Sequence, residues 1–305
     1  MGDPPPRVSM VERQHHHDLL TDTRAILSRA EELTGTPIRL IADTSLGDLA
    51  QARLKLASAP DAPHEIRFNP KDARSRDHLI AHECGHLLRL WGAPPGERYL
   101  AAVHAEGRRA AARKLQPQLE QLERLGLPDA AIRQVFDLWH QGIILQLTNA
   151  PADFRIEEWL RREHPALRQS QQHSLGRMLE RYVLAQVDRR MVTTPPLIRG
   201  ANAELNAAAA LQYAELFGDR SFVRHYPLNI TNRSLRLLRE AVEEPDDGHQ
   251  GDRRLTDHWA QRYGLRAWYR WVPVDEARGM TRALDLMPAM DAQGSRRRAE
   301  GSGPP

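Results

Sequence analysis

The sequence predicts an α+β fold that is predominantly α-helical, with a small N-terminal sheet packed on a metal-binding helix and a helical bundle after it. Apolar and polar residues alternate between residues 38 and 69, whereas beyond residue 72 apolar residues recur mainly at helical spacing. Between these regions, the sequence His-Glu-Cys-Gly-His at residues 82–86 puts two histidines one helical turn apart. These observations together predict a helical protein built around a metal site.

The first elements are a helix and three short strands. Apolar residues at helical spacing predict a helix over residues 18–33, which Gly35 and Pro37 end. Strands are expected at residues 38–42, 52–56 and 65–69. Asn69-Pro70 ends the third strand, because a residue before proline avoids helical geometry.

The remaining elements are expected to be helices. Their ranges are 73–91, 97–125, 129–148, 151–163, 171–191, 201–217, 231–243 and 253–269. Asp72 suits the N-cap of the first, and Gly92 with the prolines that follow ends it. Pro151 suits the first turn of a helix, with Asn149 near its cap.

The composition of the chain suggests four regions. Residues 1–14 are proline-rich and are expected to be disordered, as is the tail at 293–305. A catalytic domain that contains the motif at residues 82–86 is expected at residues 15–192. A helical C-terminal region follows at 193–292, after a break marked by Pro195-Pro196, and it either forms a separate unit or continues the same domain.

Composition excludes several classes of protein. The chain has 43 basic and 40 acidic residues, a net charge of +3 with the two signs interspersed, which argues against nucleic-acid binding. No apolar run is long enough for a membrane helix, and the N-terminus lacks a secretory signal. The single cysteine, Cys84, excludes an internal disulfide and is expected to be a small core residue. We therefore expect a cytoplasmic protein, and the oligomeric state stays open.

The motif at residues 82–86 predicts a zinc site. On a helix, His82 and His86 share one face, so their imidazoles can converge on one Zn²⁺ ion. Glu83 lies beside the first ligand and is expected to act as general base on a zinc-bound water. Two histidines do not complete the site, since zinc needs a third protein ligand.

Glu157 is the predicted third ligand. Asp153, Ile156, Glu157 and Leu160 form an i, i+3, i+4, i+7 stripe that should face the core, whereas Glu158 should face solvent. Asp153 is expected to hydrogen-bond a ligand histidine, or to be the ligand itself. Two alternatives stay open: Glu106, 20 residues after His86, as the ligand, or both carboxylates paired with arginines such as Arg155.

The residue that would stabilise an oxyanion is not fixed by the sequence. Four residues have side chains that can polarise a substrate carbonyl: Tyr99, His104, His140 and Tyr213.

Residues 64–91, a short strand, a proline and a helix with His-Glu-Cys-Gly-His, resemble the zinc-peptidase core of the gluzincins. The small cytoplasmic ImmA/IrrE type is the most similar, and the resemblance extends over about residues 18–91. It implies a zinc peptidase with an acidic third ligand that cleaves a protein or peptide substrate. Downstream, the Phe-Ala-Ala-like run of that type is absent, and the segment around Asp153 and Glu157 takes its place.

An alternative comes from a different class of protein. The chain would then be a non-catalytic helical interaction or regulatory protein with a structural metal site. Such a site would take a fourth protein ligand, with Asp153 beside Glu157, and would leave no position for water.

Overall fold

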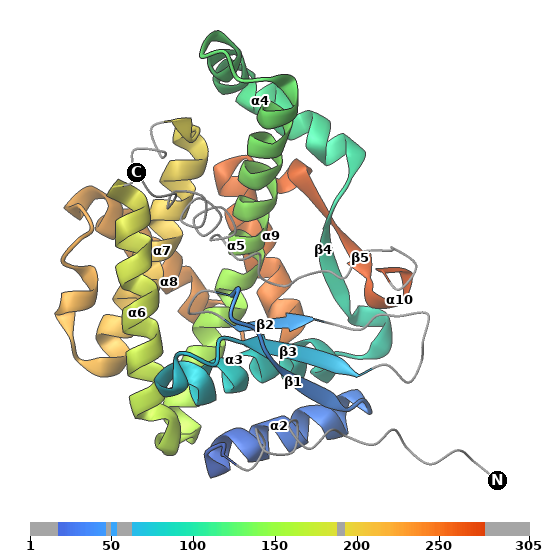
Figure 1. The fold of residues 1–305 in the computed structure, drawn as a ribbon, viewed down its shortest axis with the longest axis vertical. Coiled ribbons are helices and arrows are strands. Elements are labelled where there is room, and N and C mark those ends of the chain that lie inside the picture. The colour runs from blue at the N-terminus through green and yellow to red at the C-terminus, as the bar shows by residue number, and fades with distance from the viewer. Residues whose placement is uncertain (1–17, 47–49, 54–62, 188–192, 278–305) are drawn as a thin grey trace, which may run out of the picture.

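The computed structural model describes residues 18–46, 50–53, 63–187 and 193–277, and it has the predicted class, a mainly helical α+β fold (Figure 1). The helices are α2 (Thr21–Thr34), α3 (Ala73–Gly92), α4 (Ala105–Arg124), α5 (Asp129–Glu163), α6 (Arg168–Val187), α7 (Pro196–Phe217), α8 (Leu228–Glu243), α9 (His249–Tyr263) and α10 (Val274–Ala277). The strands are β1 (Ile38–Ala42), β2 (Ala50–Arg53), β3 (His64–Phe68), β4 (Tyr99–Val103) and β5 (Tyr269–Pro273). The expected disordered ends, at 1–14 and 293–305, lie outside the described residues.

The N-terminal sheet has the order β1-β3-β2, with β1 parallel and β2 antiparallel to β3. Leu40, Ile66 and Ala52 stand in register across it and are buried, so one row of side chains contributes to the core. Strands β2 and β3 pack against α3, as predicted. Helix α2 also packs on α3, where Asp77 Oδ1 accepts hydrogen bonds from the Leu20 amide and the Thr23 hydroxyl at 2.6 and 2.9 Å.

A second sheet, β4 with β5, was not predicted (Figure 1). Tyr99 pairs with Pro273 and Val103 with Tyr269, so two segments that are far apart in the sequence meet in this antiparallel ribbon. The helix expected at 97–125 therefore begins only at residue 105, and the helix expected at 253–269 ends already at residue 263. Each strand has only five residues, and its partner is distant in sequence, so local periodicity carries little signal for either.

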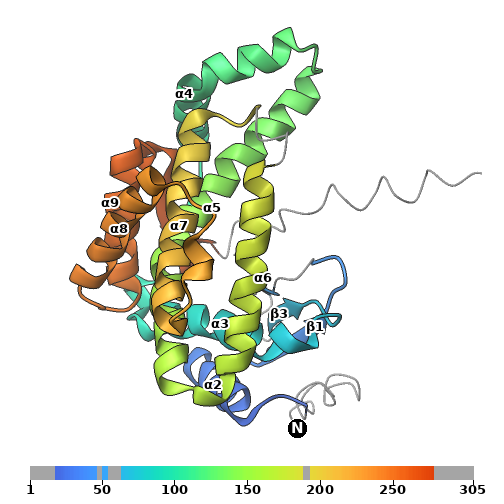
Figure 2. The ribbon, with the colours of Figure 1, turned by 90° about the vertical axis from the view of Figure 1, so that its left-hand side faces the viewer.

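Helix α5 runs unbroken from Asp129 to Glu163, whereas the sequence predicted two helices with a break at 149–150. Pro151 lies inside the helix and is buried, so the prediction that it occupies the first turn of a helix was wrong. A proline within a helix removes one hydrogen bond and costs about 3 kcal/mol. Packing against α3, α7 and α9 compensates, and Figure 2 shows α5 running through the middle of the helical layer.

The described residues form two apolar clusters that do not follow the chain order. Val272 and Val274 near the C-terminal end belong to the cluster around α2, α3 and the N-terminal sheet. Phe136 and Ile143 of α5 belong to the cluster around α7 and α9. The division into a catalytic region and a C-terminal region at residue 193 stays a prediction. No helix among the described residues is both long and apolar enough to cross a membrane.

Helices α3 and α5 are in close contact at Gly85. A Cβ atom on Gly85 would lie 2.8 Å from Cγ2 of Ile156, which is closer than carbon atoms can pack. Ile156 is itself fully buried, so it has little room to move. The absence of a side chain at residue 85 thus sets the spacing of these two helices.

We therefore expect Gly85→Ala to destabilise the fold by about 1–3 kcal/mol, because it overpacks this contact. Ile156→Ala should also destabilise the fold. The double variant should lose less stability than the two single variants lose in sum, since the methyl group at residue 85 then has space. Chemical denaturation of the four proteins measures this coupling. Strict additivity would show that the contact does not set the helix spacing.

Candidate metal centre

Three side chains from α3 and α5 converge on one point. His82 and His86 lie one turn apart on α3, and their Nε2 atoms are 3.1 Å from each other. Asp153 Oδ1, from α5, is 3.0 Å from His86 Nε2 and 3.4 Å from His82 Nε2. These three atoms form a triangle with sides of 3.0–3.4 Å.

The size of this triangle suits one zinc ion. Ligand atoms about 2.0–2.1 Å from a tetrahedral ion are about 3.3 Å apart, close to all three sides observed. Asp153 Oδ1 is buried yet accepts no hydrogen bond of good geometry among the described residues. Two imidazole nitrogens and a carboxylate oxygen are also ligand types that Zn²⁺ takes. The residues present therefore fit the ion that the motif implies.

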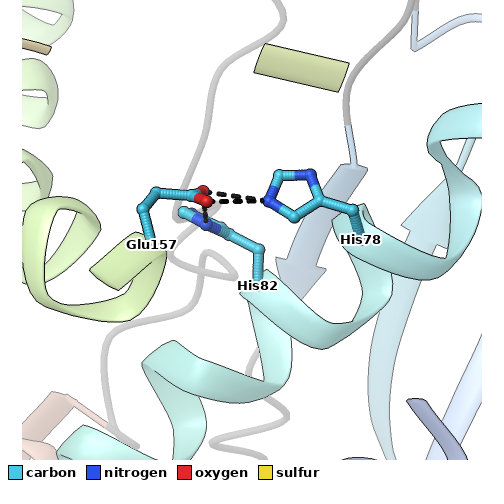
Figure 3. A group of neighbouring side chains, drawn as sticks. All are labelled: His78, His82 and Glu157. Atoms are coloured by element: carbon cyan, nitrogen blue, oxygen red, sulfur yellow. Dashed lines mark hydrogen bonds and ion pairs between the residues drawn. The ribbon is translucent and has the colours of Figure 1, made fainter. Parts of the chain in front are cut away.

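Glu157 lies at the other nitrogen of the His82 ring, Nδ1, and Figure 3 shows its carboxylate facing both His78 and His82. Its Oε1 atom is 2.7 Å from His82 Nδ1, and both carboxylate oxygens are 3.0 Å from His78 Nε2. Gln171 of α6 donates to Glu157 Oε2 at 2.7 Å and to the Glu157 carbonyl at 2.8 Å. The carboxylate is thus fully bonded, and the side chain is 1% exposed.

The charges of this cluster support one another. Burial would raise the pKa of Glu157, but contact with His78 and His82 holds it well below its usual range. Burial would likewise raise the pKa of Asp153, but contact with His82 and His86 outweighs burial and lowers that pKa. The pKa of His82 is raised well above its usual value, because its bonds to Asp153 and Glu157 outweigh the effect of burial. In the metal-free protein the two carboxylates therefore favour the protonated form of His82.

The structure brings Glu157 to His82, as expected, but not to His86. Its described ion pairs are with His78 and His82, whereas Asp153 contacts both motif histidines. The geometry thus favours the role left open for Asp153, that of third ligand, with Glu157 as the partner of the His82 Nδ1 proton. The predicted stripe is confirmed, since Ile156, Glu157 and Leu160 are buried and Glu158 is exposed.

The two rival arrangements are not seen. Glu106 is exposed in the first turn of α4 and does not join the described clusters of potential metal ligands. Arg155 does not pair with Asp153 or Glu157 either. The Arg155 side chain points from α5 toward α9, where its Nη1 atom donates a hydrogen bond of 2.8 Å to Asp252 Oδ1.

Glu83, the predicted general base, has a structural contact as well. Its Oε2 atom accepts a hydrogen bond of 2.9 Å from the backbone N–H of Ala52, and the residue is 3% exposed. This bond ties α3 to the outer strand β2. Among the described residues, Oε1 of Glu83 accepts no hydrogen bond, so it keeps the capacity to receive a proton.

An arginine–aspartate network holds α9 against the metal-binding helices. Asp252 of α9 accepts bonds from Arg89 of α3, at 2.6 and 2.8 Å, and from Arg155 of α5, at 2.8 Å. Arg89 also binds Asp246 at 2.6 Å. Because these groups bond so closely, the pKa of Arg89 is raised even though burial opposes this. The network fixes α9 beside His86.

The four candidates for stabilising an oxyanion, and Cys84, lie in different parts of the structure. His104 caps α4, and buried His140 lies 3.1 Å from the Trp268 carbonyl through Nε2, so both have structural partners. Tyr213 is buried in the second apolar cluster, whereas Tyr99 lines a cavity next to His86. Cys84 is a buried core residue, as expected, and burial raises the pKa of its thiol.

Sequence analysis missed His78 and Gln171. His78 had a usable signal, since residues 78, 82 and 86 repeat every four positions and lie along one helix face. Gln171 had none, because its role depends on how α6 packs on α3 and α5.

No family model, curated protein or solved structure matches this chain. The resemblance of residues 18–91 to the gluzincins thus rests on the sequence pattern alone.

We expect Asp153→Ala and His86→Ala to abolish stoichiometric zinc binding, because each removes one corner of the triangle. Glu157→Gln should bind zinc about 10–100-fold more weakly, as is typical for loss of an outer-shell partner. Glu158→Gln and Glu106→Gln are the controls and should leave affinity unchanged, since both side chains are exposed. Competition titration with a chelator measures all five. Full loss in Glu157→Gln with retention in Asp153→Ala would reverse the two roles.

Zinc affinity should also depend on pH. In the metal-free protein the raised pKa of His82 keeps Nε2 protonated near neutral pH, and zinc must displace that proton. Apparent affinity should therefore rise about tenfold per pH unit below this pKa and level off above it. Titrations in two buffers of different ionisation enthalpy would count the protons released. A pH-independent affinity between pH 6 and 8 would contradict the charge state described for His82.

Proposed function

We propose that this chain is a zinc-dependent metallopeptidase that hydrolyses a peptide bond in a protein or peptide substrate. The triangle of His82 Nε2, His86 Nε2 and Asp153 Oδ1, sized for one tetrahedral ion, is the observation that supports this most directly. A family relationship to the gluzincins and a cytoplasmic location, both inferred from the sequence, belong to the same proposal.

The exposure of the three ligand side chains favours a catalytic site over a closed one. His82, His86 and Asp153 are 15%, 12% and 30% exposed, so solvent reaches part of each of these side chains. No fourth histidine, cysteine or carboxylate joins this triangle among the described residues. A catalytic zinc site has this composition, three protein ligands and one position left for water.

Each described residue then has a defined task. A bound zinc ion would polarise the scissile carbonyl and lower the pKa of the attacking water. Glu83 takes the proton of that water and passes it to the leaving amine. Glu157 holds the His82 ring by accepting its Nδ1 proton, so that Nε2 faces the ion. His78 and Gln171 hold Glu157 in turn.

The geometry gives little support to the alternative, a structural site closed by both carboxylates. Glu157 and Asp153 lie at different nitrogens of the His82 ring, Nδ1 and Nε2. These nitrogens point in widely different directions, so the two carboxylates do not meet at one ion in this arrangement. A closed site would require Glu157 to leave the bonds it makes with His78 and Gln171.

The test separates the two roles of Glu83. Glu83→Gln keeps an oxygen for the Ala52 amide but cannot accept the proton of water, so stability and zinc content should stay unchanged. Hydrolysis of casein or of a peptide library should fall by about 10²–10⁴-fold, the usual contribution of a general base.

Glu83→Ala is the matched comparison. It should lose activity and also about 1–3 kcal/mol of stability, because it leaves the buried amide of Ala52 unpaired. The proposal fails if zinc-loaded wild type cleaves nothing, or if Glu83→Gln is as active as wild type on a substrate that wild type cleaves.

A further inference from the structure

A small cavity adjoins the metal centre on the side of His86. Its volume is about 120 Å³, and it lies between α3, α5, α9 and the β4–β5 ribbon. Its wall includes His86, Tyr99, Asn149, His249, Arg253 and Trp271. A space of this size holds several water molecules or a short polar side chain. Because His86 borders both the cavity and the ligand triangle, a group bound here would lie next to the reacting bond.

Arg253 is held in this wall by two aromatic rings. Its guanidinium carbon lies 3.9 Å from the centre of the Tyr99 ring and 5.1 Å from that of Trp271. Stacking of this kind covers the flat faces of a guanidinium and leaves its N–H edge for hydrogen bonds. The Nε atom of Arg253 is buried and has no hydrogen-bond partner among the described residues.

Arg253 also differs from Arg89, the other arginine of this wall, in its charge balance. Arg89 binds Asp252 and Asp246, and the Asp252 charge is further compensated by Arg155. No described carboxylate lies within ion-pair distance of Arg253; Asp257 on the same helix binds Arg266 instead. His249 adds no negative charge and is neutral, since burial lowers its pKa to about 4. The cavity therefore presents one oriented guanidinium that makes no ion pair with a described carboxylate.

We propose that Arg253 is a specificity-determining residue that binds a carboxylate of the substrate in this cavity. The carboxylate belongs to an aspartate or glutamate side chain or to a free C-terminus, and its two oxygens meet the N–H edge of the guanidinium. This inference rests on the proposed peptidase function, because it assigns the substrate class of that same site. Tyr99, with Trp271, holds the guanidinium plane in place before the substrate arrives.

The experiment uses zinc-loaded full-length protein and two paired sets of short peptides. In the first pair, glutamate at each position is replaced by glutamine. In the second pair, the free C-terminus is replaced by an amide. Hydrolysis by wild type is compared with Arg253→Gln, Arg253→Lys and the control Arg254→Gln, which removes the same charge from the adjacent residue. Arg254 is bound outside the cavity by Glu244 and Asp247, each at 2.6 Å. Zinc content and thermal stability confirm that each variant folds.

Binding of the same peptides to zinc-loaded Glu83→Gln protein, with and without Arg253→Gln, gives a readout that does not need hydrolysis. Wild type should prefer the carboxylate member of one pair by about 10–100-fold. Arg253→Gln should lose this preference, Arg253→Lys should keep part of it, and Arg254→Gln should keep all of it. The pair that shows the effect identifies the source of the carboxylate.

Each of the other possible outcomes contradicts the role of Arg253, the peptidase proposal or both. Hydrolysis without preference for either carboxylate overturns the role of Arg253 and leaves the peptidase proposal standing. Carboxylate-dependent binding that needs Arg253, with no hydrolysis of any peptide, supports the role of Arg253 in binding and overturns the peptidase. If no peptide is either bound or cleaved, both proposals are overturned. A preference that survives in Arg253→Gln also overturns the role of Arg253.

Discussion

The close contact between α3 and α5 at Gly85 and Ile156 is the constraint on which the metal centre depends. His82 faces Glu157 and His86 faces Asp153, so one turn forward on α3 matches one turn back on α5. At this contact the two i, i+4 pairs therefore meet in opposite chain order. A larger side chain at residue 85 would move α5 outward and separate both pairs. On α5, Asp153 is the proposed metal ligand, and Glu157, one turn later, supports the ring of His82.

Burial of so many charged groups requires that each be compensated. Glu157 is surrounded by His78, His82 and Gln171, and its Oε1 atom accepts the Nδ1 proton of His82. On the neighbouring side, Asp252 lies between Arg89 and Arg155. Breaking a buried pair of this kind costs more than the pair contributes, because the remaining charge stays desolvated. The two networks therefore act as supports that fix α5 and α9 around the site.

Local sequence patterns were enough to predict the class of fold and the elements that hold the motif. The spacing of His82 and His86 and the apolar stripe around Glu157 both depend on one helix at a time, and both are confirmed. The assignment of Asp153 and Glu157 depends on which ring nitrogen each carboxylate meets, and only the docking of the two helices fixes that. The same reason explains the missed β4–β5 pairing and the unbroken helix through Pro151, since long-range packing decided each of them.

The position of the metal relative to the His82 ring tests this account most directly. Crystals of zinc-loaded protein, measured on both sides of the zinc absorption edge, would show the ion as an anomalous peak. The account predicts one peak about 2.0–2.2 Å from His82 Nε2, His86 Nε2 and a carboxylate oxygen of Asp153, with Glu157 still bonded to Nδ1. A peak bound instead by His82 Nδ1, His78 and Glu157 would contradict it, as would zinc-loaded crystals with no peak at the triangle.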